Sequence, residues 1–146
     1  MGLDNLAVGM NCDEKTFGHV AFFFPDFFEE TETGYTLVKE PTQELIKFCK
    51  EEIEVQQISQ EKDYDSFERK VAEHIAKGLS NEDKATILKN PNYSRYHFGF
   101  GMYIRNRYIH GRELRAQMES RFIKMADDIS AGVFHDLVKI LQDEKK

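Results

Sequence analysis

The segment HFGFGMYIRNRYIHG, residues 97–111, holds the residue types in this chain that are best suited to chemistry. Arg105 carries a lasting positive charge that can bind a phosphate or a carboxylate, and His110 can exchange a proton near neutral pH. Residues four apart share a helix face, so Asn106 and His110 would lie together while Arg105 would point away from His110. The segment is therefore either a catalytic pair or a structural signature that ends in a histidine.

Residues 89–116 form a basic stretch within an acidic chain. Six lysine or arginine residues lie there with the single acid Glu113, whereas the whole chain has a net charge of −6. This asymmetry predicts a surface that binds a partner protein or a small anionic ligand. The alternative is that the arginines pair with acids elsewhere in the fold. The candidate binding residues are His97, Tyr103, Arg107, Tyr108, Arg112 and Arg115.

Other classes of site have little support in the composition. The histidines and the two cysteines, Cys12 and Cys49, do not lie at the spacings of a metal site, so we expect no metal and no cofactor. No apolar run approaches the roughly 20 residues that cross a membrane, and the N-terminus lacks the pattern of a signal peptide. We therefore expect a cytoplasmic protein with no membrane partner, either monomeric or homodimeric.

The first 39 residues favour extended structure. Residues 1–16 are mixed in character and are predicted to be loosely ordered. Within residues 17–39, the run VAFFF (20–24), a polar turn (30–34) and the run YTLV (35–38) predict a small N-terminal β-hairpin or an extended segment.

Residues 41–143 carry apolar residues at helical spacing, which predicts a mainly α fold of five to six helices in a single domain. Ser80 is a candidate cap for a short helix that Asn90-Pro91 ends. A long helix is predicted from about Tyr93 to His110, with Gly111 as its stop. The apolar faces expected on four helices are Leu45, Ile46, Cys49 and Ile53; Phe67, Val71 and Ile75; Leu114, Met118, Phe122 and Met125; and Phe134, Leu137, Val138 and Leu141.

Gly99 and Gly101 fall inside the predicted long helix. Each costs a helix about 1 kcal/mol relative to alanine, so we expect a neighbouring helix to approach closely there. The spacing lacks the third glycine and the preceding strand of a phosphate-binding loop, and it is weak evidence for any ligand.

Residues 105–110, Arg-Asn-Arg-Tyr-Ile-His, resemble the R-N-x-x-x-H motif of the HEPN superfamily of all-α ribonucleases. In that family two copies meet across a dimer cleft and cut RNA without a metal ion. The resemblance implies that Arg105 would hold the scissile phosphate and that Asn106 would position the pair. His110 would then transfer protons as the ribose 2′-OH attacks, with RNA as the partner.

A second resemblance covers more of the chain. Residues 79–106, with the sequence LSNEDKATILKNPNYSRYHFGFGMYIRN, and residues 126–130, ADDIS, resemble a bacterial family of unknown function. Its members carry the motifs L-S-x-E-D-K, H-F-G-x-G-M-x-I-R-N and D-D-x-S in this order, and no catalytic histidine follows the asparagine. Several ordered motifs are harder to obtain by chance than one hexapeptide, so this resemblance ranks first. It brings no activity with it.

Arg105 and Asn106 are costly inside an apolar helix unless partners satisfy their polar groups. We expect those partners to be Asp127 and Asp128, the two aspartates of the matching D-D motif. In a structural interpretation Arg105 and these acids form a polar clamp, and in a functional interpretation they line a polar pocket.

The preferred hypothesis is a small helical domain of bacterial or phage type. It would bind a partner protein or a small anionic ligand through the surface of residues 93–115. The alternative is a metal-independent ribonuclease of HEPN type that uses Arg105 and His110 in a dimer cleft.

Overall fold

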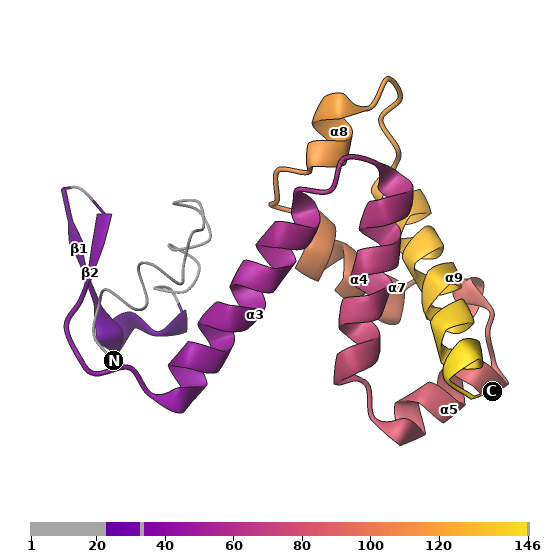
Figure 1. Ribbon diagram of the computed structural model, residues 1–146, viewed down its shortest axis with the longest axis horizontal. Helices are drawn as coiled ribbons and strands as arrows, with labels where there is room; N and C mark the ends of the chain where they lie inside the picture. Colours follow the sequence, from indigo (N-terminus) through magenta and orange to yellow (C-terminus); the bar gives the residue numbers. More distant parts are fainter. Residues whose placement is uncertain (1–22, 33, 146) are drawn as a thin grey trace. The chain divides into compact units, whose positions relative to one another are not determined.

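The computed structural model describes residues 23–32 and 34–145 (Figure 1). The chain forms two compact units, Met1–Gln57 and Ile58–Lys146, and each is described by itself. The prediction of loose order for residues 1–16 lies outside the described residues, as do residues 20–22 of the predicted first strand.

In the first unit, a short 3₁₀-helix, η1 (Pro25–Phe27), leads into an antiparallel hairpin of β1 (Phe28–Thr31) and β2 (Gly34–Leu37). The predicted hairpin is present, but its first strand begins later than expected. Phe23 and Phe24 are not in a strand, because Pro25 lacks an amide hydrogen and its fixed φ favours a helical turn. Their rings instead lie 5.6 and 5.2 Å from the ring of Phe48 in α3 (Gln43–Ser59).

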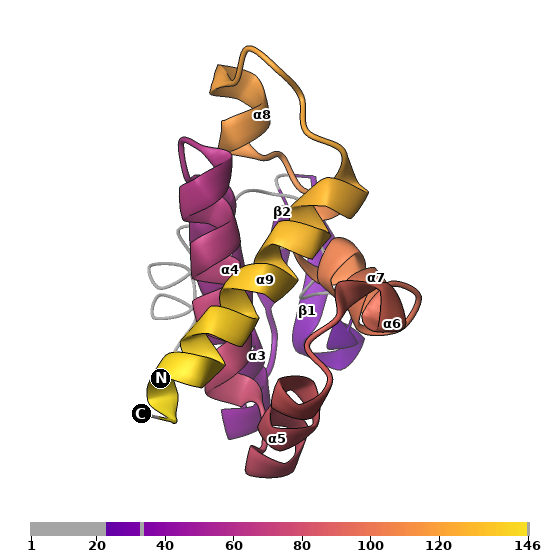
Figure 2. The ribbon, with the colours of Figure 1, turned by 90° about the vertical axis from the view of Figure 1, so that its right-hand side faces the viewer.

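The second unit is helical, and its last helix is its centre. The elements are α4 (Tyr64–Gly78), α5 (Asn81–Lys89), α6 (Tyr93–Tyr96), α7 (Phe100–Ile104), the π-helix η2 (Arg105–Ile109), α8 (Arg115–Glu119) and α9 (Ala126–Glu144). Helix α9 lies beside α4 and also contacts α5, α6, α7 and η2 (Figures 1 and 2). The prediction of a mainly α fold is confirmed. The described residues contain seven α-helices, of which α6, α7 and α8 have only four or five residues.

Side-chain caps mark the starts of two helices of this unit. The Asp63 side chain accepts a hydrogen bond of 2.8 Å from the Ser66 amide at the start of α4. Ser80 caps α5 as predicted, since its Oγ accepts a hydrogen bond of 3.1 Å from the Asp83 amide. The predicted core positions on α4 and α9 are all buried, whereas on α3 Leu45 and Cys49 are buried and Ile46 and Ile53 are half-buried.

The predicted long helix from Tyr93 to His110 is wrong. Residues 97–99 form a turn between α6 and α7, and Gly99 has φ −96° and ψ −84°. The segment is thus divided into α6, α7 and η2.

The predicted apolar stripe after Gly111 is also wrong in part. Leu114 is buried, but the side chains of Met118, Phe122 and Met125 are 71%, 80% and 69% exposed. Helix α8 ends at Glu119, and beyond it the Ser120 hydroxyl donates a hydrogen bond of 2.6 Å to the Phe122 carbonyl oxygen. This local turn replaces the helix that would have carried the stripe inward. The cap of α9 is Met125, and Asp127 and Asp128 lie in its first turn.

Phe134 is the aromatic centre of the second unit. It is 2% exposed, and its ring lies 5.8, 5.0 and 6.2 Å from the rings of Tyr93, Tyr96 and Phe100. We expect Phe134→Ala to lower the free energy of unfolding by about 3–5 kcal/mol, because it leaves a cavity among these rings. Urea denaturation followed by circular dichroism measures this loss.

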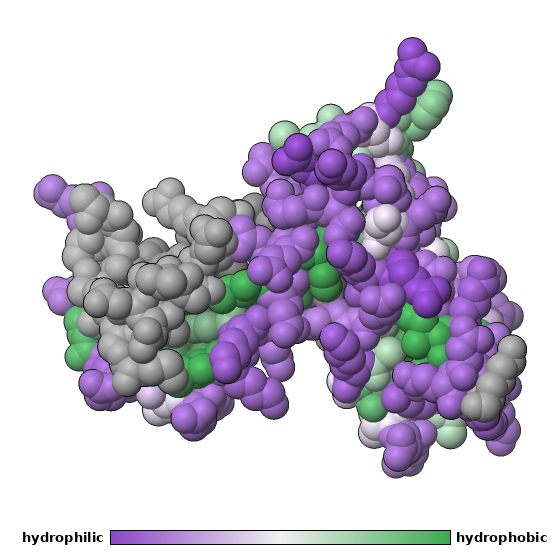
Figure 3. All heavy atoms as spheres, in the orientation of Figure 1, coloured by the Kyte–Doolittle hydropathy of each residue, from purple (hydrophilic) through white to green (hydrophobic). Residues whose placement is uncertain are grey.

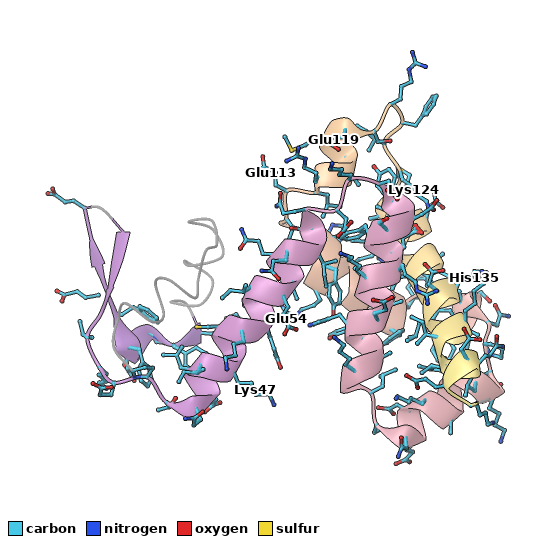
Figure 4. The ribbon with its side chains drawn as sticks, viewed as in Figure 1. Lys47, Glu54, Glu113, Glu119, Lys124 and His135 are labelled. Atoms are coloured by element: carbon cyan, nitrogen blue, oxygen red, sulfur yellow. The ribbon has the colours of Figure 1, made fainter. Side chains whose placement is uncertain are left out.

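The neighbouring exposed residue of α9, His135, is the matched control (Figure 4). His135→Ala should change the free energy of unfolding by less than about 0.5 kcal/mol. Equal losses for the two variants would contradict the assignment of Phe134 to the core.

Candidate functional site

The Arg105 side chain lies inside the second unit. It is 8% exposed, and its guanidinium donates three hydrogen bonds to neighbouring elements. Nη1 donates to the hydroxyl of Tyr93 at 3.0 Å and to that of Ser130 at 3.2 Å, and Nη2 donates to the carbonyl oxygen of His97 at 3.0 Å. One side chain therefore joins η2 to α6, to the turn after α6 and to α9.

An acid completes this group of contacts, here called the Arg105 cluster (Arg105, Tyr93, His97, Ser130 and Asp127). The Nε atom of Arg105 lies 3.5 Å from Oδ1 of Asp127, whose side chain is 65% exposed. The hydroxyls of Tyr93 and Ser130 are 2.6 Å apart, and the Ser130 hydroxyl donates to the Asp127 carbonyl oxygen at 2.9 Å. The cluster is a connected polar network, and such a network fixes the positions of its members.

The two aspartates expected near Arg105 differ in position. Asp127 lies within ion-pair distance of the guanidinium, whereas Asp128 is exposed and forms no ion pair with Arg105 in the part of the chain that the structure describes. Both lie in the first turn of α9, where acidic residues interact favourably with the helix dipole.

The backbone of Gly101 lies in close contact with side chains of the Arg105 cluster. A Cβ atom built there would lie 2.7 Å from the Tyr93 hydroxyl and 3.0 Å from Nη1 of Arg105. The expected close approach at Gly101 is thus made by the side chains of the cluster. At Gly99 a Cβ atom would meet no heavy atom within 4 Å.

The π-helix decides which residues of the R-N-x-x-x-H motif face inward. The His110 amide donates to the carbonyl oxygen of Arg105 at 2.8 Å, a five-residue step in place of the usual four. Arg105 and Ile109 are buried on its inner side, while Asn106 and His110 are exposed. Beyond it, Gly111 adopts φ +74°, the left-handed conformation that ends a helix at glycine.

Tyr108 is a candidate binding residue that lies in the core. It is 2% exposed, and its hydroxyl is hydrogen-bonded to Nδ1 of His74 at 2.7 Å. Burial raises the pKa of the Tyr108 hydroxyl far above its ordinary value, and the neighbouring Tyr103 raises it further. Tyr108 joins η2 to α4 and cannot offer its ring to a partner.

The other candidate binding residues reach the surface. His97, Arg107 and Arg112 are half-buried, while Tyr103 and Arg115 are exposed. Nε of Arg112 donates to the Arg107 carbonyl oxygen at 3.0 Å, and Arg115 pairs with Glu119 at 2.7 Å.

Sequence reasoning missed two exposed residues beside them. Phe98 is 80% exposed and Met102 is 45% exposed, next to Tyr103 at 49%. The helix predicted from about Tyr93 to His110 includes both residues. The flanking glycines were the one sequence signal that the helix could be interrupted there.

A second group of exposed apolar side chains lies between α8 and α9. Met118, Phe122, Ile123 and Met125 are 69% to 80% exposed, and residues 118–125 are here called the apolar segment. Green atoms among purple ones mark exposed apolar residues near α8 in Figure 3. Single exposed apolar residues are common, but four within eight positions call for a physical reason.

Within residues 23–32 and 34–145, no three or more His, Cys, Asp or Glu side chains are grouped as a metal site would require. No helix in the same residues has both the length and the apolar character needed to cross a membrane.

The two glycines of the GFG sequence provide a matched pair of variants. We expect Gly101→Ala to lower the free energy of unfolding by about 1–3 kcal/mol, because the new methyl group displaces the Tyr93 hydroxyl or the Arg105 guanidinium. Gly99→Ala should stay within about 0.5 kcal/mol of the parent chain. Chemical denaturation of the purified variants gives both values, and equal effects would contradict the close packing at Gly101.

Comparison with models of known protein families places the second unit. The model of a family described as a domain of unknown function (DUF6794) matches residues 69–141, half of the chain. The match begins in α4, ends in α9 and includes the whole Arg105 cluster. No curated protein and no solved structure matches the chain significantly. The expected resemblance to an uncharacterised family is confirmed at this level, and the chain belongs to the DUF6794 family.

Proposed function

We propose that this chain is a binding domain that captures an acidic segment of a partner protein through residues 93–115. The observation that carries the proposal is the exposure of Phe98, Met102 and Tyr103 within the basic stretch of the chain. Aromatic residues, methionine and arginine are the residue types enriched at protein interfaces.

The exposed aromatic side chains make ring contacts with neighbouring residues of the same domain. The Phe98 ring lies 4.9 Å from the ring of His97, whose carbonyl oxygen is bound by Arg105. The Tyr103 ring stacks on that of Phe100 at 6.0 Å and 21°. Side chains that are already ordered lose less conformational entropy on binding, so they make efficient anchors.

Charge favours an acidic partner. The stretch of residues 89–116 contains six basic residues and one acid in a chain whose net charge is −6. Arginines at the edge of an interface attract an acidic segment over a distance and repel a basic one. The polar surface thereby selects the class of partner, while the apolar rings supply the contact area.

The ribonuclease alternative is not proposed. A phosphate-binding arginine must present its guanidinium to the substrate, but that of Arg105 is buried and donates its hydrogen bonds within the fold. Withdrawing it would leave a polar network unsatisfied in the interior.

A defined acidic, aromatic polymer tests the proposal. Fluorescence anisotropy would measure binding of the purified chain to a labelled random copolymer of glutamate and tyrosine, with a lysine and tyrosine copolymer for comparison. We expect binding to the acidic copolymer alone. Phe98→Ala and Tyr103→Ala should each weaken it at least about fivefold, as for residues worth 1 kcal/mol or more at an interface.

Phe122→Ala is the matched control, because Phe122 is as exposed as Phe98 but lies outside the proposed surface. It should bind as the parent chain does, and all three variants should keep the parent thermal midpoint. Unchanged binding of Phe98→Ala and Tyr103→Ala would refute the proposed surface. Full displacement of the copolymer by millimolar inorganic phosphate would instead favour a small anionic ligand.

A further inference from the structure

The geometry points to a charge-controlled latch in the second unit. The ion pair between Lys124 and the buried Glu68 holds the apolar segment against α4, and protonation of Glu68 releases it. This inference goes beyond the proposed function, because it concerns a part of the surface that the proposed binding residues do not include.

Glu68 is an acid enclosed between two helices. It lies on α4 and is 5% exposed, and a Cβ atom at Gly132 of α9 would overlap its carboxylate. Because Gly132 has no side chain, the Glu68 carboxylate fits against the backbone of α9. Nζ of Lys124 lies 2.5 Å from Oε1 of Glu68 and supplies the compensating charge.

Lys124 is also the point where the apolar segment is fastened to α4. Its backbone amide donates to the Tyr64 hydroxyl at 3.1 Å, and its ammonium lies 5.8 Å from the centre of the Tyr64 ring. Figure 4 shows Lys124 beside the N-terminal end of α4. Three contacts of one residue, all with α4, thus fix the end of the segment that leads into α9.

On the N-terminal side of the apolar segment, two buried side chains hold the chain to the core. Leu114 and Ala116 are 1% and 0% exposed, whereas Met118, Phe122 and Ile123 between these two anchors are 71%, 80% and 74% exposed. A segment held at two places with little buried between them depends strongly on each anchor. Loss of the Lys124 anchor would free the chain from Ser120 to Met125.

The electrostatic surroundings make Glu68 easier to protonate than an ordinary glutamate. Burial is the largest effect and raises the pKa of Glu68 above its ordinary value. The hydrogen bond and the positive charge of Lys124 lower this pKa. The nearby carboxylates of Asp136 on α9 and Asp65 on α4 raise it further. Once Glu68 is neutral, the partly buried Lys124 loses the carboxylate with which it forms its ion pair. Its ammonium then gains solvation by moving into water.

The protonation state of Glu68 determines whether the latch is closed or open. The ion pair exists above the pKa of folded Glu68, where the buried carboxylate also lowers the stability of the fold. Below that pKa the carboxyl is neutral and the pair is lost. The latch is therefore closed above the pKa of folded Glu68 and open below it.

Backbone order parameters from nitrogen-15 NMR relaxation test the latch directly. For the amides of residues 120–125 at pH 7.5, we expect values near about 0.85 that fall below about 0.6 as the pH is lowered through the titration of Glu68. Glu68→Gln, which mimics the neutral acid, should give low values at every pH. Lys124→Arg should keep the behaviour of the parent chain.

The control is another ion pair of the same helix, between Lys70 and Glu61 at 2.5 Å, whose Lys70 is exposed. Glu61→Gln should leave the order parameters of residues 120–125 unchanged. Parent-like order in Glu68→Gln at pH 7.5, or order in the parent chain that does not change while Glu68 titrates, would overturn the inference.

A stability measurement keeps the test valid if Glu68→Gln alters the fold. The free energy of unfolding of Glu68→Gln, relative to the parent chain, should rise with pH, because only the parent chain ionises a buried carboxyl. A difference that does not depend on pH would show that Glu68 does not titrate in the folded state with a raised pKa, and would also overturn the latch.

Discussion

The burial of one guanidinium constrains most of the second unit. A buried cation costs several kcal/mol unless hydrogen bonds and an opposite charge compensate it. Arg105 is compensated by α6, by the turn after α6 and by α9, so these elements must converge on η2. The small size of Gly101 follows from the same requirement, since the guanidinium passes directly over it.

The sequence was informative where structure depends on near neighbours. Helical spacing identified the buried faces of α4 and α9, and the Ser80 cap was recognisable because its partner is only three residues away. Apart from its two glycines, the long predicted helix carries no local sign of its break, because the groups that bind Arg105 lie 8, 12 and 25 residues from it. Contacts between residues far apart in the sequence determine where residues 93–110 leave the helical path. The spacing of apolar residues carries no information about such contacts.

The same reasoning failed for the apolar residues that remain at the surface. Leu114, Met118 and Phe122 recur every four residues, just as core residues of a helix do, yet only Leu114 is buried. Whether such a stripe reaches the core depends on whether the helix continues, and the Ser120 hydroxyl ends it by binding the Phe122 carbonyl oxygen. Phe98 and Met102 were misjudged for a similar reason, because the turn at residues 97–99 changes the face that they occupy.

Two buried charges thus support two exposed apolar surfaces, and they differ in one property. A guanidinium keeps its charge at every pH at which proteins fold, so the Arg105 cluster holds the surface around Phe98 and Tyr103 in a single arrangement. A carboxyl can lose its charge, and the surroundings of Glu68 bring that loss toward neutral pH. The fold therefore places a permanent anchor behind the proposed binding surface and a titratable one behind the apolar segment. A domain built in this way can alter one surface while the other stays unchanged.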